Sequence, residues 1–247
     1  MKKSGNTILV TGGGSGIGRE MARRWASWGN TVIVAGRTVE SLEGTAQGFD
    51  NIHPMALDVA DAASISAFAR DVIARFPALN VLVNNAGIMK VEDVTGARDL
   101  GDAEDMVTIN LLGPIRLTDA LVDHLAAQDD AAIVNVSSGL AFVPLVRAAT
   151  YSATKAALHS YTVSLRDALA GKIEVIEVPP PAVQTELTPG QSEREGYMPL
   201  AAFIDETMAQ FESGETPAEV KTKAVGFLRD AEAEGRFEAA LGALRQL

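Results

Sequence analysis

A glycine-rich segment near the start of the chain limits the possible folds more than any other feature. Its eight residues, Thr11–Gly18, read TGGGSGIG and join a short apolar run, Ile8–Thr11, to a helical pattern from Gly16 to about Trp28. Glycine allows a tight turn that brings backbone N–H groups against a pyrophosphate, which the positive end of the helix dipole also attracts. A glycine cluster alone can be a simple turn. The strand–turn–helix context instead predicts a dinucleotide-binding site.

Short β-branched segments alternate with longer helical patterns as far as Val178, which is typical of a parallel sheet covered by helices. The predicted strands are Ile8–Thr11, Thr31–Ala35, Ile52–Leu57, Leu79–Asn84, Ala132–Ser137 and Ile173–Val178. The predicted helices are Gly16–Trp28, Ala62–Phe76, Ala103–Ala127 with a bend near Gly113-Pro114, and Tyr151–Ala170. We therefore expect an α/β fold of the Rossmann type, a doubly wound parallel sheet with helices on both faces, as one domain over residues 1–247.

The alternation weakens after Val178, where we expect a substrate flap and a small helical lobe at about residues 186–234. Thr188–Pro199 is polar and predicts the flap, and helices are expected at Leu200–Glu212 and Pro217–Glu234. The second helix is predicted from a capping box in which Thr216 is the N-cap and Glu219 stands three residues later. The tail is consistent with one more short strand at Phe237–Leu241.

Composition excludes several classes of function. The formal net charge of −11 at pH 7 disfavours binding to nucleic acid or to anionic lipid. The absence of cysteine excludes disulfides, thiolate metal sites and cysteine nucleophiles. His53, His124 and His159 are scattered without carboxylates at metal-ligand spacing, so we expect no metal site. The sequence also contains no signal peptide and no apolar stretch of membrane-spanning length, which favours a cytoplasmic protein.

Two further motifs follow predicted strands. Asp58-Val59 comes after the third strand, and Asn84-Asn85-Ala86-Gly87 closes the fourth. With the glycine segment, these motifs resemble those of the short-chain dehydrogenase/reductase family, in its branch of about 250 residues, over the region from Asn6 to Leu187. The resemblance implies an oxidoreductase that moves a hydride between a nicotinamide dinucleotide and a carbonyl or alcohol.

Four polar residues form a candidate catalytic group. Tyr151 and Lys155 are four residues apart on a predicted helix and share one face, Ser138 ends the fifth strand, and Asn110 lies in the long helix. A tyrosine is a poor acid–base catalyst at neutral pH unless a nearby positive charge lowers the pKa of its phenol. A neighbouring hydroxyl can stabilise charge on the substrate oxygen. Each residue alone could occur by chance, whereas all four stand in the order and spacing of the family.

The resemblance implies a role for each of these residues. Tyr151 would be the general acid/base, Ser138 would polarise the carbonyl, and Lys155 would lower the tyrosine pKa and contact the nicotinamide ribose. Asn110 would hold a water that relays protons from Lys155, and Ser137 is one position off the family spacing. The residues expected to bind the cofactor are Gly12, Ser15, Gly16, Ile17, Gly18, Arg37, Thr38, Asp58, Val59, Asn85, Ala86, Gly87, Tyr151, Lys155, Pro181, Val183 and Thr185.

The end of the second strand predicts the cofactor. Members of the family that prefer NAD carry an acidic residue there, whereas this chain has Gly36 followed by Arg37. A guanidinium suits a 2′-phosphate, so NADP is favoured over NAD, the alternative being that Arg37 only stacks on adenine. Pro181 replaces the glycine that usually follows the sixth strand, and this form resembles the DltE-type oxidoreductase branch.

The expected substrate is a neutral, largely apolar ketone, aldehyde or alcohol. The segments that would wall its pocket, Gly139–Pro144, Pro181-Ala182 and Tyr197–Leu200, contain no charged residue, although Leu140 and Leu200 can also be core packing. The alternatives are a non-catalytic dinucleotide-binding sensor or scaffold, and an epimerase or dehydratase, which usually has a longer C-terminal domain. Association through the two long helices is expected to give a homodimer or homotetramer.

Overall fold

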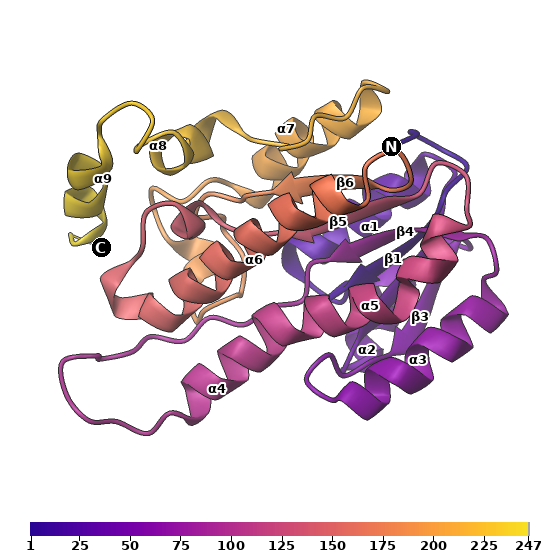
Figure 1. Ribbon diagram of the computed structural model, residues 1–247, viewed down its shortest axis with the longest axis horizontal. Helices are drawn as coiled ribbons and strands as arrows, with labels where there is room; N and C mark the ends of the chain where they lie inside the picture. Colours follow the sequence, from indigo (N-terminus) through magenta and orange to yellow (C-terminus); the bar gives the residue numbers. More distant parts are fainter. Residues whose placement is uncertain (247) are drawn as a thin grey trace.

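The computed structural model describes residues 1–246, which form a six-stranded parallel sheet in the order β3-β2-β1-β4-β5-β6 (Figure 1). The strands are β1 (Thr7–Thr11), β2 (Thr31–Gly36), β3 (Ile52–Ala56), β4 (Leu79–Asn84), β5 (Ala132–Val136) and β6 (Glu174–Val178). This arrangement confirms the predicted doubly wound α/β fold. The strand order reverses between β1 and β4, and ligands of such sheets bind beyond the carboxyl ends of the strands at that point.

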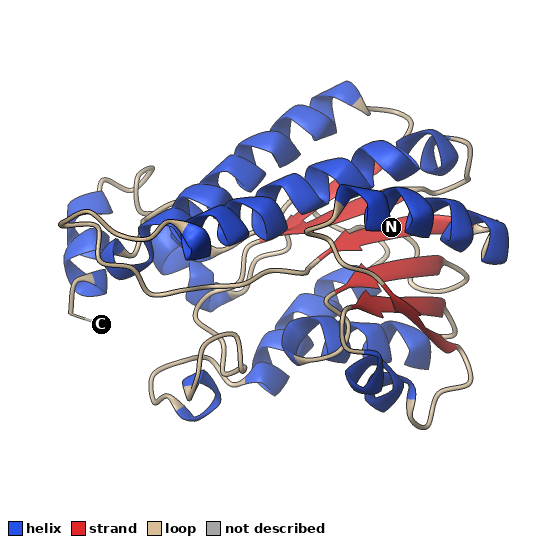
Figure 2. Cartoon of the chain, turned by 90° about the horizontal axis from the view of Figure 1, so that it is seen from below, coloured by secondary structure: helices blue, strands red, loops and turns tan. Residues whose placement is uncertain are grey.

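Helices cover both faces of the sheet, which is why most strand residues are buried (Figure 2). Helices α1 (Gly16–Ser27), α2 (Val39–Ala46) and α7 (Leu200–Glu212) pack on one face. Helices α3 (Ala62–Arg75) and α5 (Gly113–Ala126) pack on the other, and α6 (Ala149–Ala168) lies beside them. Within the described residues, no helix combines the length and apolar character that crossing a membrane requires.

The predicted long helix at 103–127 is interrupted. It consists of α4 (Gly101–Val107), a π-helical turn at Thr108–Leu112, and α5, which begins with Gly113-Pro114. The irregular turn therefore precedes the proline where we expected a bend. π-Helical turns are rare and frequent at functional sites, and this one contains Asn110. The short helix α2 was not predicted, because its eight residues include Gly44 and bury only Leu42 and Thr45.

The prediction of a helix at Pro217–Glu234 is wrong. Residues 218–220 instead pair with the outer edge of β6, where the Glu177 N–H donates to the Ala218 carbonyl (2.9 Å) and the Val220 N–H to the Glu177 carbonyl (2.8 Å). Only a 3₁₀ turn at Lys223–Val225 and the four-residue helix α8 (Gly226–Arg229) follow. The free edge of β6 offers hydrogen-bond partners to the backbone of this segment. These bonds are formed in place of the helix that the capping box at Thr216 predicts.

The expected strand at Phe237–Leu241 is also wrong, since α9 (Phe237–Leu244) occupies this segment. Ala240 and Leu244 lie one turn apart and are buried in a cluster with Val143 and Tyr151. Two apolar residues four positions apart lie on one face of a helix, but they would also lie on one face of a strand. In so short a segment the spacing alone does not distinguish the two structures. The C-terminal residues therefore cover the side of α6 that carries Tyr151.

Buried amides connect the middle of the sheet to the helices on one face. Asn84 and Asn135 lie opposite each other on β4 and β5, and the Asn84 Nδ2 donates to the Asn135 Oδ1 (2.9 Å). The Asn135 Nδ2 in turn donates to the Thr162 hydroxyl on α6 (2.9 Å). This contact holds α6 in a fixed position over β5.

Candidate active site

The carboxyl ends of β1 and β4 are tied together by Thr11 and Asn85. The Thr11 hydroxyl accepts from the backbone N–H groups of Asn85 (3.0 Å) and Ala86 (3.1 Å), and the Asn85 Nδ2 donates to the Thr11 carbonyl (2.9 Å). Gly12, with φ of +65°, lies against this junction, where an added Cβ would stand 2.9 Å from the Ala86 Cα. The glycine is therefore required by both the backbone conformation and the space.

The turn before α1 fits a phosphate group. A Cβ on Gly18 would stand 2.5 Å from the Gly12 carbonyl oxygen, so the turn and the helix approach as closely as glycine permits. Ser15 is the exposed N-cap residue, and the structure gives its side chain no capping hydrogen bond in the described chain. The first N–H groups of α1, from Gly16 to Gly18, thus remain for an anion. The Thr185 side chain lies across from Gly16, 3.5 Å from where its Cβ would be.

The other residues expected to bind the cofactor surround this turn. Arg37 and Thr38 are exposed directly after β2, and Asp58 and Val59 are half-buried after β3. One carboxylate oxygen of Asp58 is used locally, since the Asp58 Oδ1 accepts from the Ala60 N–H (3.0 Å).

Pro181, Val183 and Thr185 follow β6 beside the flap. The Met198 N–H donates to the Ala182 carbonyl (2.9 Å) and the Gln184 N–H to the Met198 carbonyl (2.9 Å). The flap is thus attached to the segment after β6 by backbone pairing on both sides of Val183.

Tyr151, Ser138 and Lys155 come together where β5 meets α6. Burial raises the pKa of Tyr151 to about 12, and a side-chain hydrogen bond with Ser138 opposes this rise. The Lys155 Nζ donates to the Val136 carbonyl (2.8 Å) and lies 5.7 Å from the centre of the Tyr151 ring. Burial lowers the pKa of Lys155 to about 8, with the Glu177 charge opposing the shift. At neutral pH, the tyrosine therefore keeps its proton and the lysine keeps its charge.

Asn110 joins the segment after β4 to the helix that carries Tyr151. Its Oδ1 accepts from the Ile88 N–H (2.8 Å), and its Nδ2 donates to the Ile88 carbonyl (2.8 Å) and to the Thr154 hydroxyl (3.3 Å). A Cβ on Gly87 would stand 3.2 Å from the Asn110 Oδ1 and 3.7 Å from the Lys155 Nζ. The structure thus brings Gly87, Asn110, Tyr151 and Lys155 into one compact group.

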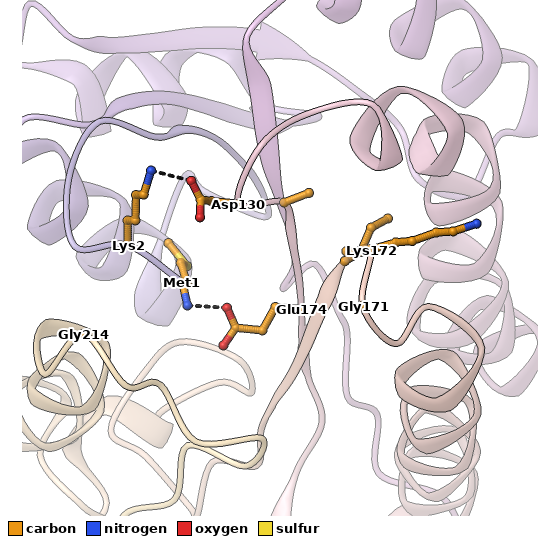
Figure 3. Close-up of a pocket in the computed structure, with 9 residues that line it drawn as sticks. Met1, Lys2, Asp130, Gly171, Lys172, Glu174 and Gly214 are labelled. Atoms are coloured by element: carbon orange, nitrogen blue, oxygen red, sulfur yellow. Dashed lines mark hydrogen bonds and ion pairs between the residues drawn. The ribbon is translucent and has the colours of Figure 1, made fainter.

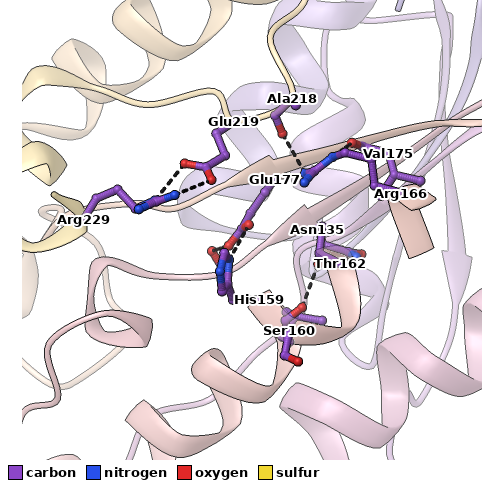
Figure 4. A network of polar contacts seen from close by, with 12 residues as sticks. Asn135, His159, Ser160, Thr162, Arg166, Val175, Glu177, Ala218, Glu219 and Arg229 are labelled. Carbon is purple, nitrogen blue, oxygen red and sulfur yellow. Dashed lines mark hydrogen bonds and ion pairs between the residues drawn. The ribbon is translucent and has the colours of Figure 1, made fainter. Parts of the chain in front are cut away.

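Sequence reasoning missed a polar network directly behind this group (Figure 4). The carboxylate of Glu177 is fully buried, accepts a hydrogen bond from the Ser137 hydroxyl, and contacts the His159 Nδ1 at 2.7 Å. The Ser137 hydroxyl is therefore used on Glu177, whereas Ser138 makes the hydrogen bond with Tyr151. Two signals were present: Tyr151, Lys155 and His159 repeat every four residues, and Glu177 interrupts an otherwise apolar strand end.

The surroundings of Tyr151 are apolar. Its ring belongs to a buried cluster with Met106, Val143, Leu145 and Ala231. Leu140, which we expected either in the pocket wall or in the core, is partly buried against the same cluster.

A separate hollow of about 430 Å³ lies at the other end of the sheet, lined by Met1, Lys2, Asp130 and Glu174 among others (Figure 3). It is open, and ion pairs of Met1 with Glu174 and of Lys2 with Asp130 hold its edge. The hollow contains none of the expected site residues, so the chemistry is assigned to the group around Tyr151 and not to this cavity.

Comparisons with known proteins agree with this geometry. The sequence model of the short chain dehydrogenase family matches residues 6–196. The uncharacterized oxidoreductase DltE of Bacillus subtilis is 41% identical over 235 residues, which cover 94% of this chain and 93% of that protein.

Two solved structures extend the similarity to the fold. A short chain dehydrogenase from Burkholderia cenocepacia in complex with NADP has a TM-score of 0.82 and 25% identity, covering 100% of both chains. A 3-ketoacyl-(acyl-carrier-protein) reductase from Brucella melitensis complexed with NADH has a TM-score of 0.71 and 31% identity, covering 74% of this chain and 78% of that one. Sequence, fold and the arrangement around Tyr151 agree, and the chain belongs to the short-chain dehydrogenase/reductase family of oxidoreductases, as an enzyme of that family.

Proposed function

We propose that the protein is an NADP-dependent carbonyl reductase or alcohol dehydrogenase for neutral, largely apolar substrates, with Ser138, Tyr151, Lys155 and Asn110 as its working residues. The observation that carries the proposal is the buried Tyr151, which makes a hydrogen bond with Ser138 and whose ring centre lies 5.7 Å from the Lys155 Nζ. A proton donor, a hydroxyl and a fixed positive charge together suit the reduction of a carbonyl.

Each side chain has a distinct part in this proposal. The Tyr151 phenol gives its proton to the substrate oxygen in reduction and takes it back in oxidation. The Ser138 hydroxyl holds that oxygen, and the Lys155 charge stabilises the phenolate that the proton leaves behind. Asn110 supports a water next to Lys155 that restores the proton. A bound nicotinamide supplies or accepts the hydride.

The cofactor site is proposed at the turn before α1. The glycine cradle and the N–H groups of α1 fit a pyrophosphate, which supports dinucleotide binding there. Arg37 is exposed after β2, where a guanidinium can pair with a 2′-phosphate. We therefore expect kcat/KM to be higher with NADPH than with NADH.

A comparison of two variants tests this cofactor assignment. Arg37→Ala should weaken NADPH binding by about tenfold, the scale of one lost charge-assisted contact, and leave NADH binding unchanged. Arg70→Ala, at an exposed position on α3, is the matched control. Equal NADPH affinity in Arg37→Ala and wild type would contradict the assignment, as would a wild-type preference for NADH.

The substrate class can be tested with a panel of ketones, aldehydes and alcohols. The apolar cluster around Tyr151 supports uncharged substrates, because burying an unpaired charge there costs several kcal/mol. A phosphorylated or dianionic substrate with the highest kcat/KM would contradict this. Tight NADPH binding without turnover of any substrate would favour the alternative, a dinucleotide-binding sensor or scaffold.

We also propose that the protein forms a homodimer or homotetramer through the α4–α5 region and α6. Val107 and Val163 on these helices are 38% and 47% exposed, and Ala153 and Ser160 add small exposed side chains on α6. Apolar and small side chains allow two helices to approach closely. Light scattering at micromolar concentration should give at least twice the mass of 26.0 kDa. A monomer mass would refute this part of the proposal.

A further inference from the structure

Glu177 is a charged residue in a position that requires an explanation. It lies one residue before the carboxyl end of β6, next to the site, and its carboxylate has no exposed surface. A buried carboxylate is costly unless hydrogen bonds or opposite charges compensate for the lost water. Its two closest polar contacts, with Ser137 and His159, link two elements that carry residues of the proposed site.

Resting on the proposed function, we propose that Glu177 is a positioning residue, whose buried carboxylate fixes the strand end before Ser138 and the helical turn after Lys155 and supplies a negative charge behind the lysine.

The positions of the contacts explain how one carboxylate can act on both elements. Tyr151, Lys155 and His159 are spaced four residues apart on α6, so they form a stripe along one face. On the sheet, Glu177 pairs with Asn135 in register, and Ser137 stands two residues after Asn135, directly beyond β5, on the same face. The Ser137 hydroxyl bond therefore anchors the residue directly before Ser138. The His159 contact anchors α6 one turn beyond Lys155.

The charges around Glu177 indicate which group it influences. On α6 it faces Lys155 and His159, and on the segment after β6 the nearest charged groups are Glu219 and Arg229. Arg229 is already paired with Glu219 through two hydrogen bonds of 2.7 and 2.8 Å. The Glu177 charge raises the pKa of Lys155 against the lowering caused by burial. Without that charge, the lysine should lose its proton at a lower pH.

The same network reaches the proposed pocket wall. The ring centres of Phe142 and His159 are 4.8 Å apart, edge to face, and the Arg229 guanidinium lies 4.4 Å from the centre of the Phe142 ring. Phe142 is close in the chain to Ser138, across the 3₁₀ turn at Gly139–Ala141. A displaced His159 would therefore also loosen this turn, which ends at the wall of the pocket.

Glu177→Gln tests the charge, because glutamine keeps the size and an accepting oxygen. We expect kcat/KM for carbonyl reduction to fall by about tenfold, with the KM for NADPH within about twofold of wild type. The alkaline limb of the pH profile should move to lower pH by about half a unit or more. Glu177→Asp keeps the charge but shortens the side chain, so it should lower kcat without moving the limb. Glu174→Gln, at the exposed start of the same strand, is the control.

A readout without turnover separates this inference from the proposed function. In protein labelled with ¹³C at lysine Cε, the Lys155 resonance is identified by its loss in Lys155→Met, and its titration gives the pKa directly. The pKa should lie lower in Glu177→Gln than in wild type, even if no substrate is turned over. A folded Glu177→Gln with unchanged Lys155 titration and unchanged kcat/KM would overturn the inference.

Two further variants keep the test decisive if Glu177→Gln does not fold. Ser137→Ala and His159→Gln each remove one contact and leave the carboxylate in place. Each should lower kcat several-fold with little change in the Lys155 pKa, because the negative charge remains. Wild-type kcat in both variants would overturn the positioning role.

Discussion

The two ends of the sheet hold the same kinds of charged groups in opposite surroundings. At the amino ends of β5 and β6, Lys2 pairs with Asp130, and their side chains are 64% and 43% exposed. At the carboxyl ends, Lys155 is 4% exposed and Glu177 is fully buried. The hydrogen bond that Lys2 donates to Asp130 raises the pKa of Lys2, whereas burial lowers the pKa of Lys155 to about 8. An acidic partner raises the pKa of both lysines, and the directions differ because burial outweighs that partner at Lys155 and not at Lys2.

The different pKa values of Lys2 and Lys155 also suggest different roles for the two lysines. A lysine that titrates far above neutral pH in water is a stable charge, whereas one that titrates near 8 responds to its surroundings in the range where enzymes work. Changes at the carboxyl ends of the strands should therefore alter activity strongly, and changes at the amino ends should alter little.

The largest effect is expected for Tyr151→Phe. The variant removes only the phenol hydroxyl, so kcat should fall by about 10²–10⁴, the contribution of a general acid. NADPH affinity and the melting temperature should stay close to wild type. Tyr161→Phe, ten residues further along the same helix, is the matched control. Retention of more than about a tenth of the activity in Tyr151→Phe would mean that another group donates the proton.

An intermediate effect is expected at Glu92, which lies at the carboxyl-end side and caps α6 from a distant loop. Its carboxylate accepts from the Thr150 N–H (2.8 Å), the Thr150 hydroxyl (2.7 Å) and Arg98 (2.8 Å). Glu92→Gln removes the charge and should destabilise the protein by about 1–2 kcal/mol and lower kcat several-fold. Glu104→Gln, at an exposed position on α4, is the control.

The pH dependence of unfolding sharpens this test. Burial would raise the pKa of Glu92, but the hydrogen bonds from Thr150 and the charge of Arg98 outweigh it and lower the pKa. A lowered folded-state pKa gives stability that is present above the unfolded value of about 4.3 and is lost as pH falls through the folded pKa. The stability difference between wild type and Glu92→Gln should therefore shrink in urea titrations as pH falls below 4.3. A stability difference that stays constant as pH falls would show that the charge of Glu92 does not contribute to stability.

The smallest effect is expected at the amino ends. Lys2→Ala breaks an exposed ion pair, and such pairs contribute little in water. The melting temperature should change by less than about 2 °C and kcat should not change. A clear loss of kcat in Lys2→Ala would contradict the expectation that the amino ends of the strands contribute little to activity.

The sequence predicted the parts of the molecule whose signals are local. The strands follow from β-branched runs, and Tyr151 and Lys155 were found together because four residues form one helical turn. The predicted helix at Pro217–Glu234 is wrong because a distant part of the chain determines the structure there. Its capping signal is local, but the exposed edge of β6 competes for the same backbone groups from forty residues away.

The site was incompletely predicted for a similar reason. His159 was judged by its neighbours in the sequence, where no carboxylate stands at a useful spacing. Its partner Glu177 comes from another element, eighteen residues along the chain. A π-helical turn, such as the one that carries Asn110, has no recognised sequence signature, so the prediction gave a continuous helix.

The hydrogen-bonded amides of Asn84 and Asn135 have a consequence for how the sheet assembles. A sheet of valine, isoleucine and leucine strands could slide by two residues and still bury apolar side chains on both faces. In this chain, a slide of β5 against β4 would separate the two amides and break the hydrogen bond between them, at a cost of about 1–3 kcal/mol for each polar group left unpaired. The amides therefore select one alignment among several apolar ones. Because Ser138 lies two residues after the end of β5, that selection also determines where its hydroxyl stands relative to the end of β4.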